Sequence, residues 1–201
     1  MFNSYDKFTT NFKKVIQRAA LACLNERSTT ITEYNILAGL ILVPESLAFD
    51  ILKKSGILAH IQQFANTAIG PAMEPQNIRH YEVDYNEVFS LSMNQSAIQI
   101  LEKAAECAIR INALYIGTEH LLYAILESGF PPLISALKNT KITPQELKQQ
   151  LLNLMRETAD KQTEHIADAN KTKLSEPAPI KNPGKQNRQA SAMLEREERI
   201  I

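Results

Sequence analysis

Two Thr-Glu pairs, Thr32-Glu33 and Thr118-Glu119, each stand directly before a run of apolar residues. A threonine at the start of a helix can accept hydrogen bonds from free backbone amides. A glutamate in the first turn places negative charge at the positive end of the helix dipole. Both pairs are therefore predicted to begin helices, with Thr32 and Thr118 as the capping residues. Gly117 precedes the second pair and can take a positive φ there at no steric cost.

The two Thr-Glu pairs belong to an internal repeat. The segments Thr32 to Leu40 and Ile116 to Leu126 follow the same pattern, and 119 − 33 gives an offset of 86 residues. Repetition at a fixed offset indicates a structural unit that is present twice. Apolar residues recur at helical spacing through both halves, without sustained two-residue alternation. The sequence thus predicts an all-α fold in which the same four-helix pattern occurs twice.

Helix boundaries can be placed from capping and breaking residues. Thr9 or Thr10 is expected to cap the first helix, Asn94 the first helix of the second half, and Thr143 the last helix through a capping box with Glu146. These signals divide the chain into four parts. The parts are a first repeat (1–69), a linker (70–90), a second repeat (91–157) and a polar tail or linker (158–201) that we expect to be flexible and disordered.

Composition and charge exclude several classes of partner. The 201 residues include 22 basic and 22 acidic ones, so the net charge of zero favours neither nucleic acid nor an anionic membrane. No apolar run approaches the roughly 20 residues of a membrane span, and the start has no basic segment followed by an apolar one. We therefore expect a cytoplasmic protein without nucleic-acid or membrane partners.

Residues for catalysis or metal binding are lacking in the sequence. Cys23 and Cys107 lie among alanines and leucines at helical spacing, where free cysteine behaves as a small apolar residue, so neither a disulfide nor a metal site is expected. No nucleophile with a base, no paired carboxylates and no G-x-x-x-x-G-K-[ST] phosphate loop occur. The expectation is a non-catalytic chain without a cofactor and without a phosphate-loop ATPase module, which is either a free-standing protein or a fragment of a longer ATP-dependent one.

Several motifs together resemble the double Clp N-terminal repeat at the front of Clp-type AAA+ unfoldases of the ClpA/ClpC kind. They are the alanine-rich first helix, the Thr-Glu motifs, and the segments Lys7-Phe8-Thr9, Leu52-Lys53-Lys54-Ser55-Gly56-Ile57 and Gly117-Thr118-Glu119-His120. The resemblance covers roughly residues 2 to 157. It implies two small helical bundles related by a pseudo-twofold axis, which form one compact domain and receive substrates or adaptor proteins ahead of the ATPase ring.

The resemblance also implies a binding site. In some Clp unfoldases of Gram-positive bacteria, the glutamate of each Thr-Glu motif holds the guanidinium of a phosphorylated arginine, and the threonine that begins the repeat's first helix contacts the phosphate. The matching residues here are Glu33, Glu119 and Thr9, with Thr32 and Thr118 beside the glutamates. A carboxylate can accept a forked pair of bonds from a guanidinium, and a helix N-terminus attracts phosphate.

Two departures from the family pattern leave a second interpretation of the glutamates open. The first copy, Thr30-Ile31-Thr32-Glu33-Tyr34, lacks the glycine and histidine of the motif, and Asn94 stands where many second repeats have threonine. An acidic residue in the first turn of a helix stabilises it by about 0.3 to 1 kcal/mol without binding any ligand. Both glutamates are therefore either ligands for a guanidinium or simply helix-stabilising residues.

Two functions fit these observations. The first is a receptor that recruits substrates or adaptors, including phosphoarginine-bearing proteins, to a Clp-type ATPase or protease. The second is a free-standing regulatory or scaffold protein that binds the Clp complex without receptor chemistry. An enzymatic function finds no support in the motifs.

Overall fold

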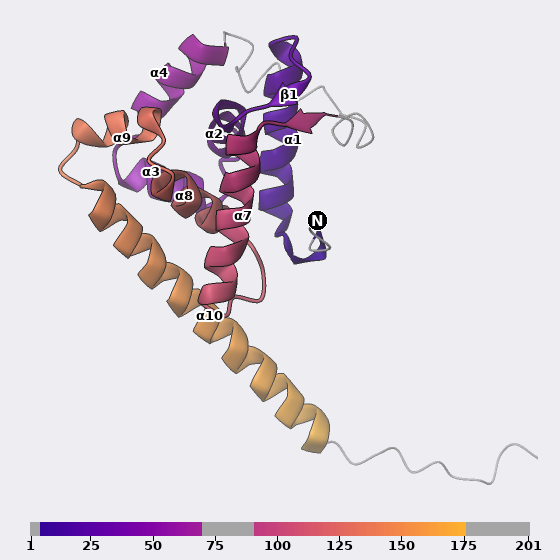
Figure 1. The fold of residues 1–201 in the computed structure, drawn as a ribbon. Helices are drawn as coiled ribbons and strands as arrows, with labels where there is room; N and C mark the ends of the chain where they lie inside the picture. The colour runs from indigo at the N-terminus through magenta and orange to yellow at the C-terminus, as the bar shows by residue number, and fades with distance from the viewer. Residues whose placement is uncertain (1–4, 70–90, 176–201) are drawn as a thin grey trace, which may run out of the picture. The chain divides into compact units, whose positions relative to one another are not determined.

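The computed structural model describes residues 5–69 and 91–175. The first half contains a short 3-10 helix η1 (Tyr5–Lys7) and helices α1 (Thr10–Asn25), α2 (Glu33–Ile41), α3 (Leu47–Lys54) and α4 (Leu58–Ile69). The second half contains α7 (Gln95–Arg110), α8 (Thr118–Glu127), α9 (Pro131–Lys138) and α10 (Pro144–Ser175) (Figure 1). The predicted all-α fold, with four α-helices in the described part of each half, is confirmed.

Most of the predicted helix caps are present. The Thr9 hydroxyl accepts a hydrogen bond from the Phe12 N–H at 3.2 Å, and the Asn94 side-chain oxygen accepts one from the Ala97 N–H at 2.8 Å. Thr32 caps α2 in the same way, and the Thr143 capping box with Glu146 begins α10. Each cap satisfies a backbone donor that the helix itself leaves free.

The start of α8 differs from the prediction. Gly117, rather than Thr118, is the N-cap, and its backbone is extended with a φ of −102°. Thr118 is the first helical residue, and its buried hydroxyl accepts a hydrogen bond from the Ala48 N–H at 3.3 Å. The expected capping role of Thr118 was wrong, because its hydroxyl serves a free amide at the start of α3 instead. Gly117 does not use the positive φ that is open to glycine.

Two short parallel pairings join the halves. Strand β1 (Thr30–Ile31) pairs with strand β2 (Ser92–Met93) (Figure 1). An isolated parallel bridge also joins Phe8 to Ile116. The first pairing lies before α2 and α7, and the second before α1 and α8. In each case, the start of the first helix of one repeat is held against the start of the second helix of the other repeat.

These pairings fix the correspondence between the repeats. The Thr9 N–H donates to the Ile116 carbonyl at 3.0 Å, and the Asn94 N–H donates to the Ile31 carbonyl at the same distance. The N-caps Thr9 and Asn94 are therefore equivalent, as are the N-caps Thr32 and Gly117. Since 94 − 9 and 117 − 32 both give 85, the offset of 86 inferred from the two Thr-Glu pairs was wrong by one residue.

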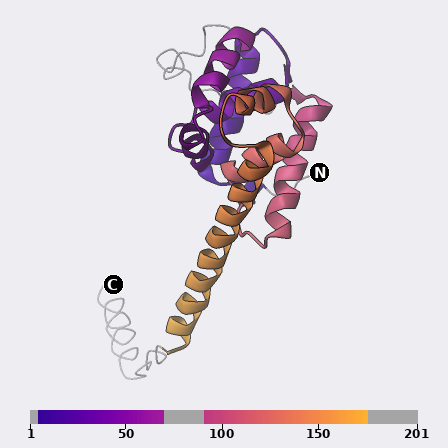
Figure 2. The same ribbon diagram turned by 90° about the vertical axis from the view of Figure 1, so that its left-hand side faces the viewer.

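The core is formed by the helices that follow these starts. In each repeat the first helix packs along the second, α1 on α2 and α7 on α8, and α4 of the first repeat lies beside α9 of the second (Figure 2). Gly39 on α2 allows the closest approach, because a Cβ there would clash with the Val15 carbonyl oxygen and would lie 2.9 Å from the Ala19 nitrogen. The α1–α2 contact is thus backbone against backbone.

A further expectation needs correction. The last helix was expected to give way to a tail at about Thr158, but α10 continues to Ser175, with Leu151, Met155 and Ala159 buried at helical spacing. Ile109, which shares the apolar spacing of α7, is 72% exposed. The predicted linker (70–90) and the last part of the predicted tail (176–201) lie outside the described residues.

Two units divide the chain, Met1–Thr163 and Glu164–Ile201, and the site considered below belongs to the first. Within residues 5–69 and 91–175, no helix combines the length and the apolar character that crossing a membrane requires.

We predict that Gly39→Ala lowers the thermal midpoint of the full chain. Helix propensity alone would make this change stabilising by about 1 kcal/mol, whereas an extra methyl against the α1 backbone costs about 1 to 3 kcal/mol. Thermal unfolding followed by circular dichroism measures the sign. An unchanged or raised midpoint would show that α1 and α2 do not approach as closely as described.

Candidate functional site

The two inter-repeat pairings create two equivalent places where helix N-termini meet. We call the place where Thr9 meets Ile116 the Thr9 junction; it contains the starts of α1 and α8. We call the place where Asn94 meets Ile31 the Asn94 junction; it contains the starts of α7 and α2. Helix N-termini carry free amides and partial positive charge, so both junctions are suited to bind an anion if their side chains leave room.

Side chains at the Asn94 junction satisfy one another. The Asn94 amide nitrogen donates to Glu33 Oε2 at 2.8 Å while the Asn94 side-chain oxygen caps α7. The Thr32 hydroxyl donates to Asn35 Oδ1 at 2.9 Å and accepts from the Asn35 N–H at 3.4 Å. The donors and the carboxylate that a ligand would need at this junction are therefore already engaged.

Asn35 extends this network towards the end of α1. Its amide nitrogen donates to Glu26 Oε1 at 3.0 Å. Partial burial raises the pKa of the Glu26 carboxyl above its ordinary value, and the hydrogen bond from Asn35 opposes that shift. The polar side chains near α2 in the first repeat thus bond the start of α2 to the end of α1.

The Thr9 junction has the same backbone arrangement, but two of its side-chain groups are unused. The Thr9 hydroxyl oxygen accepts from the Phe12 N–H, and its proton has no acceptor among the described residues. The Glu119 side chain is only 15% exposed, and no described residue donates a hydrogen bond to it. A hydroxyl donor and a carboxylate acceptor therefore remain for a ligand, and beside them the buried His120 Nε2 has no hydrogen-bond partner among the described residues.

His120 contacts Glu119 without serving as its donor. Its Nδ1 atom lies 3.1 Å from Glu119 Oε1 and accepts a hydrogen bond from the Gly117 N–H, also at 3.1 Å. A ring nitrogen that accepts a hydrogen bond carries no proton, so in this state Nδ1 cannot donate to the carboxylate. His120 thus makes a local hydrogen bond, and the Glu119 oxygen faces its lone pair rather than a donor.

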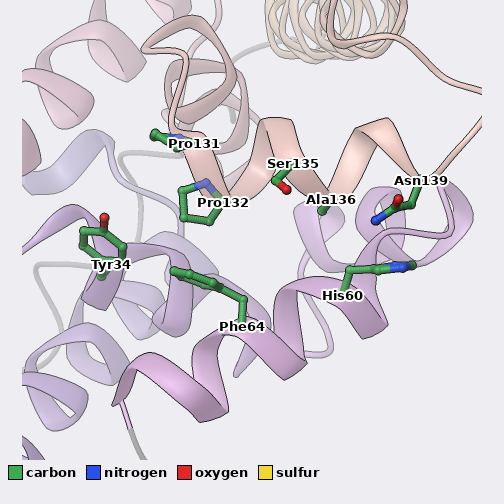
Figure 3. A pocket seen from close by; sticks show the side chains of 8 residues that line it. All are labelled: Tyr34, His60, Phe64, Pro131, Pro132, Ser135, Ala136 and Asn139. Atoms are coloured by element: carbon green, nitrogen blue, oxygen red, sulfur yellow. The ribbon is translucent and has the colours of Figure 1, made fainter.

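Counting from the N-caps, Tyr34 of α2 occupies the position of Glu119 in α8, and Glu33 occupies that of Thr118. The Tyr34 ring packs edge-on against Phe130 at 4.9 Å and lies 5.9 Å from the Phe64 ring, both measured between centroids. It lines an open cavity of about 410 Å³ between α4 and α9, shown in Figure 3. The first repeat therefore has an aromatic side chain where the second has its carboxylate.

The structure brings together only some of the predicted site residues. Thr9 and Glu119 stand at the starts of α1 and α8, which share one junction, while Glu33 lies at the other junction and is bonded to Asn94. The hydroxyls of Thr32 and Thr118 serve the protein's own backbone or side chains. Within the described ranges, no three His, Cys, Asp or Glu side chains are arranged to hold a metal ion.

Sequence reasoning missed three features of this region. Tyr34 was assigned to the histidine position of the motif, and the Asn94–Glu33 bond was not foreseen. The exposed Tyr115 (53%), next to the equally overlooked Leu114, lies directly before the Ile116 bridge. One signal was available, because Ile31 and Ile116 both precede the N-cap and align at an offset of 85 rather than 86.

Comparisons with known proteins give a consistent result. The family model described as "Clp repeat (R) N-terminal domain" matches this chain twice, over residues 7–127 and 92–178. A relative named negative regulator of genetic competence ClpC/MecB, from Bacillus subtilis, is 26% identical over 152 residues, which are 75% of this chain. The chaperone protein ClpB of Oceanobacillus iheyensis is 24% identical, also over 75% of this chain.

Two solved structures share the fold. The Hsp104 N-terminal domain from Candida albicans has a TM-score of 0.54 at 19% identity, covering 74% of this chain and 91% of that one. A chain from a study of a malarial protein secretion system has a TM-score of 0.56 at 15% identity, covering 76% and 97%. This chain spans about 17% of the length of the ClpC and ClpB relatives.

We predict that Asn94→Asp destabilises the chain by about 1 to 2 kcal/mol, close to the loss of a good helix cap. Aspartate can still cap α7, but it cannot donate to Glu33 and places a second carboxylate beside it. The double variant Asn94→Asp, Glu33→Gln exchanges donor and acceptor and should recover most of the loss. Urea unfolding measures both variants, and equal stability of the single and double variants would contradict the described bond.

Proposed function

The chain belongs to the Clp repeat N-terminal domain family, and on that basis we propose that it is a non-catalytic protein-binding domain of the Clp system. In this proposal it recruits protein substrates or adaptor proteins to a Clp-type AAA+ unfoldase. Of the two relatives whose N-terminal regions it matches, one is named the chaperone protein ClpB and the other the negative regulator of genetic competence ClpC/MecB. The family model describes the N-terminal domain of such proteins and not their ATPase modules.

We propose further that the Thr9 junction binds a phosphorylated arginine on the recruited protein. The guanidinium would donate two parallel N–H hydrogen bonds to the two oxygens of the Glu119 carboxylate. The phosphate would lie at the start of α1, where its oxygens accept hydrogen bonds from the Thr9 hydroxyl and from the free backbone amides of the first turn. One modified side chain would thus satisfy both unused groups at once.

The observation that carries this proposal is the difference between the two junctions. At the Asn94 junction, the carboxylate and a donor are bonded to each other at 2.8 Å. At the Thr9 junction, the carboxylate is largely buried and no described residue donates to it. Removing a carboxylate from water without a donor is unfavourable, so a cationic ligand at Glu119 would gain more than one at Glu33.

A protein partner, rather than a free amino acid, is supported by the surface beside the junction. Leu114 and Tyr115 directly precede the Ile116 bridge and are exposed. Aromatic residues are enriched in protein interfaces because they supply contact area at low entropic cost. In this proposal, residues flanking the phosphorylated arginine contact these two side chains.

We predict that Glu119→Gln weakens the binding of a phosphoarginine-containing peptide by about 10-fold to 150-fold. This corresponds to the loss of about 1.5 to 3 kcal/mol from a charge-assisted hydrogen bond. Isothermal titration of the full chain measures the affinity, and the unphosphorylated peptide provides the baseline.

The matched control for that measurement is Glu33→Gln. It neutralises the glutamate whose carboxylate already accepts a hydrogen bond from Asn94. We expect this variant to bind the phosphorylated peptide within about twofold of the native chain. Equal losses in both variants would contradict the assignment of the site to one junction. A native chain that does not distinguish the phosphorylated from the unphosphorylated peptide would refute the phosphoarginine proposal and favour a scaffold role.

A further inference from the structure

Gly117 lies in direct contact with the carboxylate of Glu119. A Cβ built on Gly117 would stand 2.6 Å from Glu119 Cδ and would clash with both carboxylate oxygens. The backbone of Gly117 is extended, at a φ of −102° and a ψ of 177°, so any residue could adopt its conformation. Glycine is needed here for the space that its missing side chain leaves, and not for its conformational freedom.

We infer that Gly117 is a positioning residue that lets the Glu119 carboxylate fold back over the N-cap of α8. This inference rests on the proposed function, because the carboxylate concerned is the one assigned to a guanidinium. The contact keeps the Glu119 side chain largely buried, close to the backbone that pairs with Phe8 and Thr9. Any larger residue at position 117 would push the carboxylate away from this place.

The first repeat has a different residue at each of the two equivalent positions. Its N-cap is Thr32, whose side chain is bonded to Asn35, and two residues later stands Tyr34 instead of a glutamate. The pair Gly117 with Glu119 is thus replaced by the pair Thr32 with Tyr34. A side chain at the N-cap and a carboxylate folded over that cap would occupy the same space, so each repeat has one of them.

The N-cap residue therefore determines whether a repeat can hold a carboxylate in place for a guanidinium. With glycine at the cap, the carboxylate is held in one place, as forked hydrogen bonding to a planar guanidinium requires. With a larger residue, a glutamate at the second helical position would turn towards solvent, where a cation gains little from it. The guanidinium site is accordingly a property of the second repeat alone.

The test uses Gly117→Ala in the full chain, with two readouts. The first is the NMR cross-relaxation between the Glu119 Hγ protons and the Hα of residue 117, which reports the folded-back side chain without any ligand. The second is the affinity for the phosphoarginine peptide. We expect the cross-peak to disappear and the affinity to fall at least tenfold, with the thermal midpoint changed by only a few degrees.

A double variant separates positioning from a general structural effect. If Gly117 acts through Glu119, Gly117→Ala adds no further loss of affinity in the Glu119→Gln background. Thr32→Ala is the matched control at the equivalent N-cap; it should lower stability and leave peptide affinity unchanged. Gly117→Ser, whose hydroxyl can cap α8, should show the same loss of affinity as Gly117→Ala while retaining the fold.

A persistent cross-peak in Gly117→Ala would overturn the inference, as would a lost cross-peak with unchanged affinity or an additive loss in the double variant. If the native chain does not bind the peptide, the proposed function fails. The cross-peak then still decides whether Gly117 positions the carboxylate.

Discussion

The reciprocal backbone pairing between the repeats is the constraint on which the rest of the structure depends. The Thr9 N–H bonds to the Ile116 carbonyl, and the Asn94 N–H bonds to the Ile31 carbonyl, both at 3.0 Å. Each bond satisfies a backbone donor just before a helix, where the helix cannot satisfy it. Because the pairing is exchanged between the halves, every junction contains one helix start from each repeat, and neither repeat can form a junction alone.

Because both junctions have the same backbone pairing, only their side chains determine whether a junction can bind a ligand. Asn94 and Glu33 close one junction with a mutual hydrogen bond, and Tyr34 leaves it without a carboxylate at the second helical position. The other junction keeps the Thr9 hydroxyl proton and the Glu119 carboxylate unused among the described residues. The backbone is therefore the same at both junctions while the side chains differ, and this difference is the basis for our proposal that a ligand binds at the glutamate of the second repeat.

Much of this could be predicted from the sequence, because local capping chemistry is strong at Thr9, Thr32, Asn94 and Thr143. The family could also be recognised from the sequence, because the motif Gly117 to His120 is specific to it. The register between the repeats could not, because the Thr-Glu pairs match better at 86 than at the structural offset of 85. The alignment of Ile31 with Ile116 was the one signal in the sequence for 85. The tertiary pairings of Ile31 with Met93 and of Ile116 with Phe8 decide for it, and they place Tyr34, not Glu33, at the position equivalent to Glu119.

The central claim is that the Thr9 junction can bind a ligand, whereas the side chains of the Asn94 junction are bonded to one another and leave no place for one. An NMR titration of the isotope-labelled native chain with a phosphoarginine peptide tests it most directly, because it reports both junctions and the stoichiometry together. The account predicts one peptide per chain, with shifts centred on the backbone around Thr9 and Gly117 to Glu119 and none around Asn94 and Glu33. Two equivalents bound, or shifts of similar size at both junctions, would contradict it.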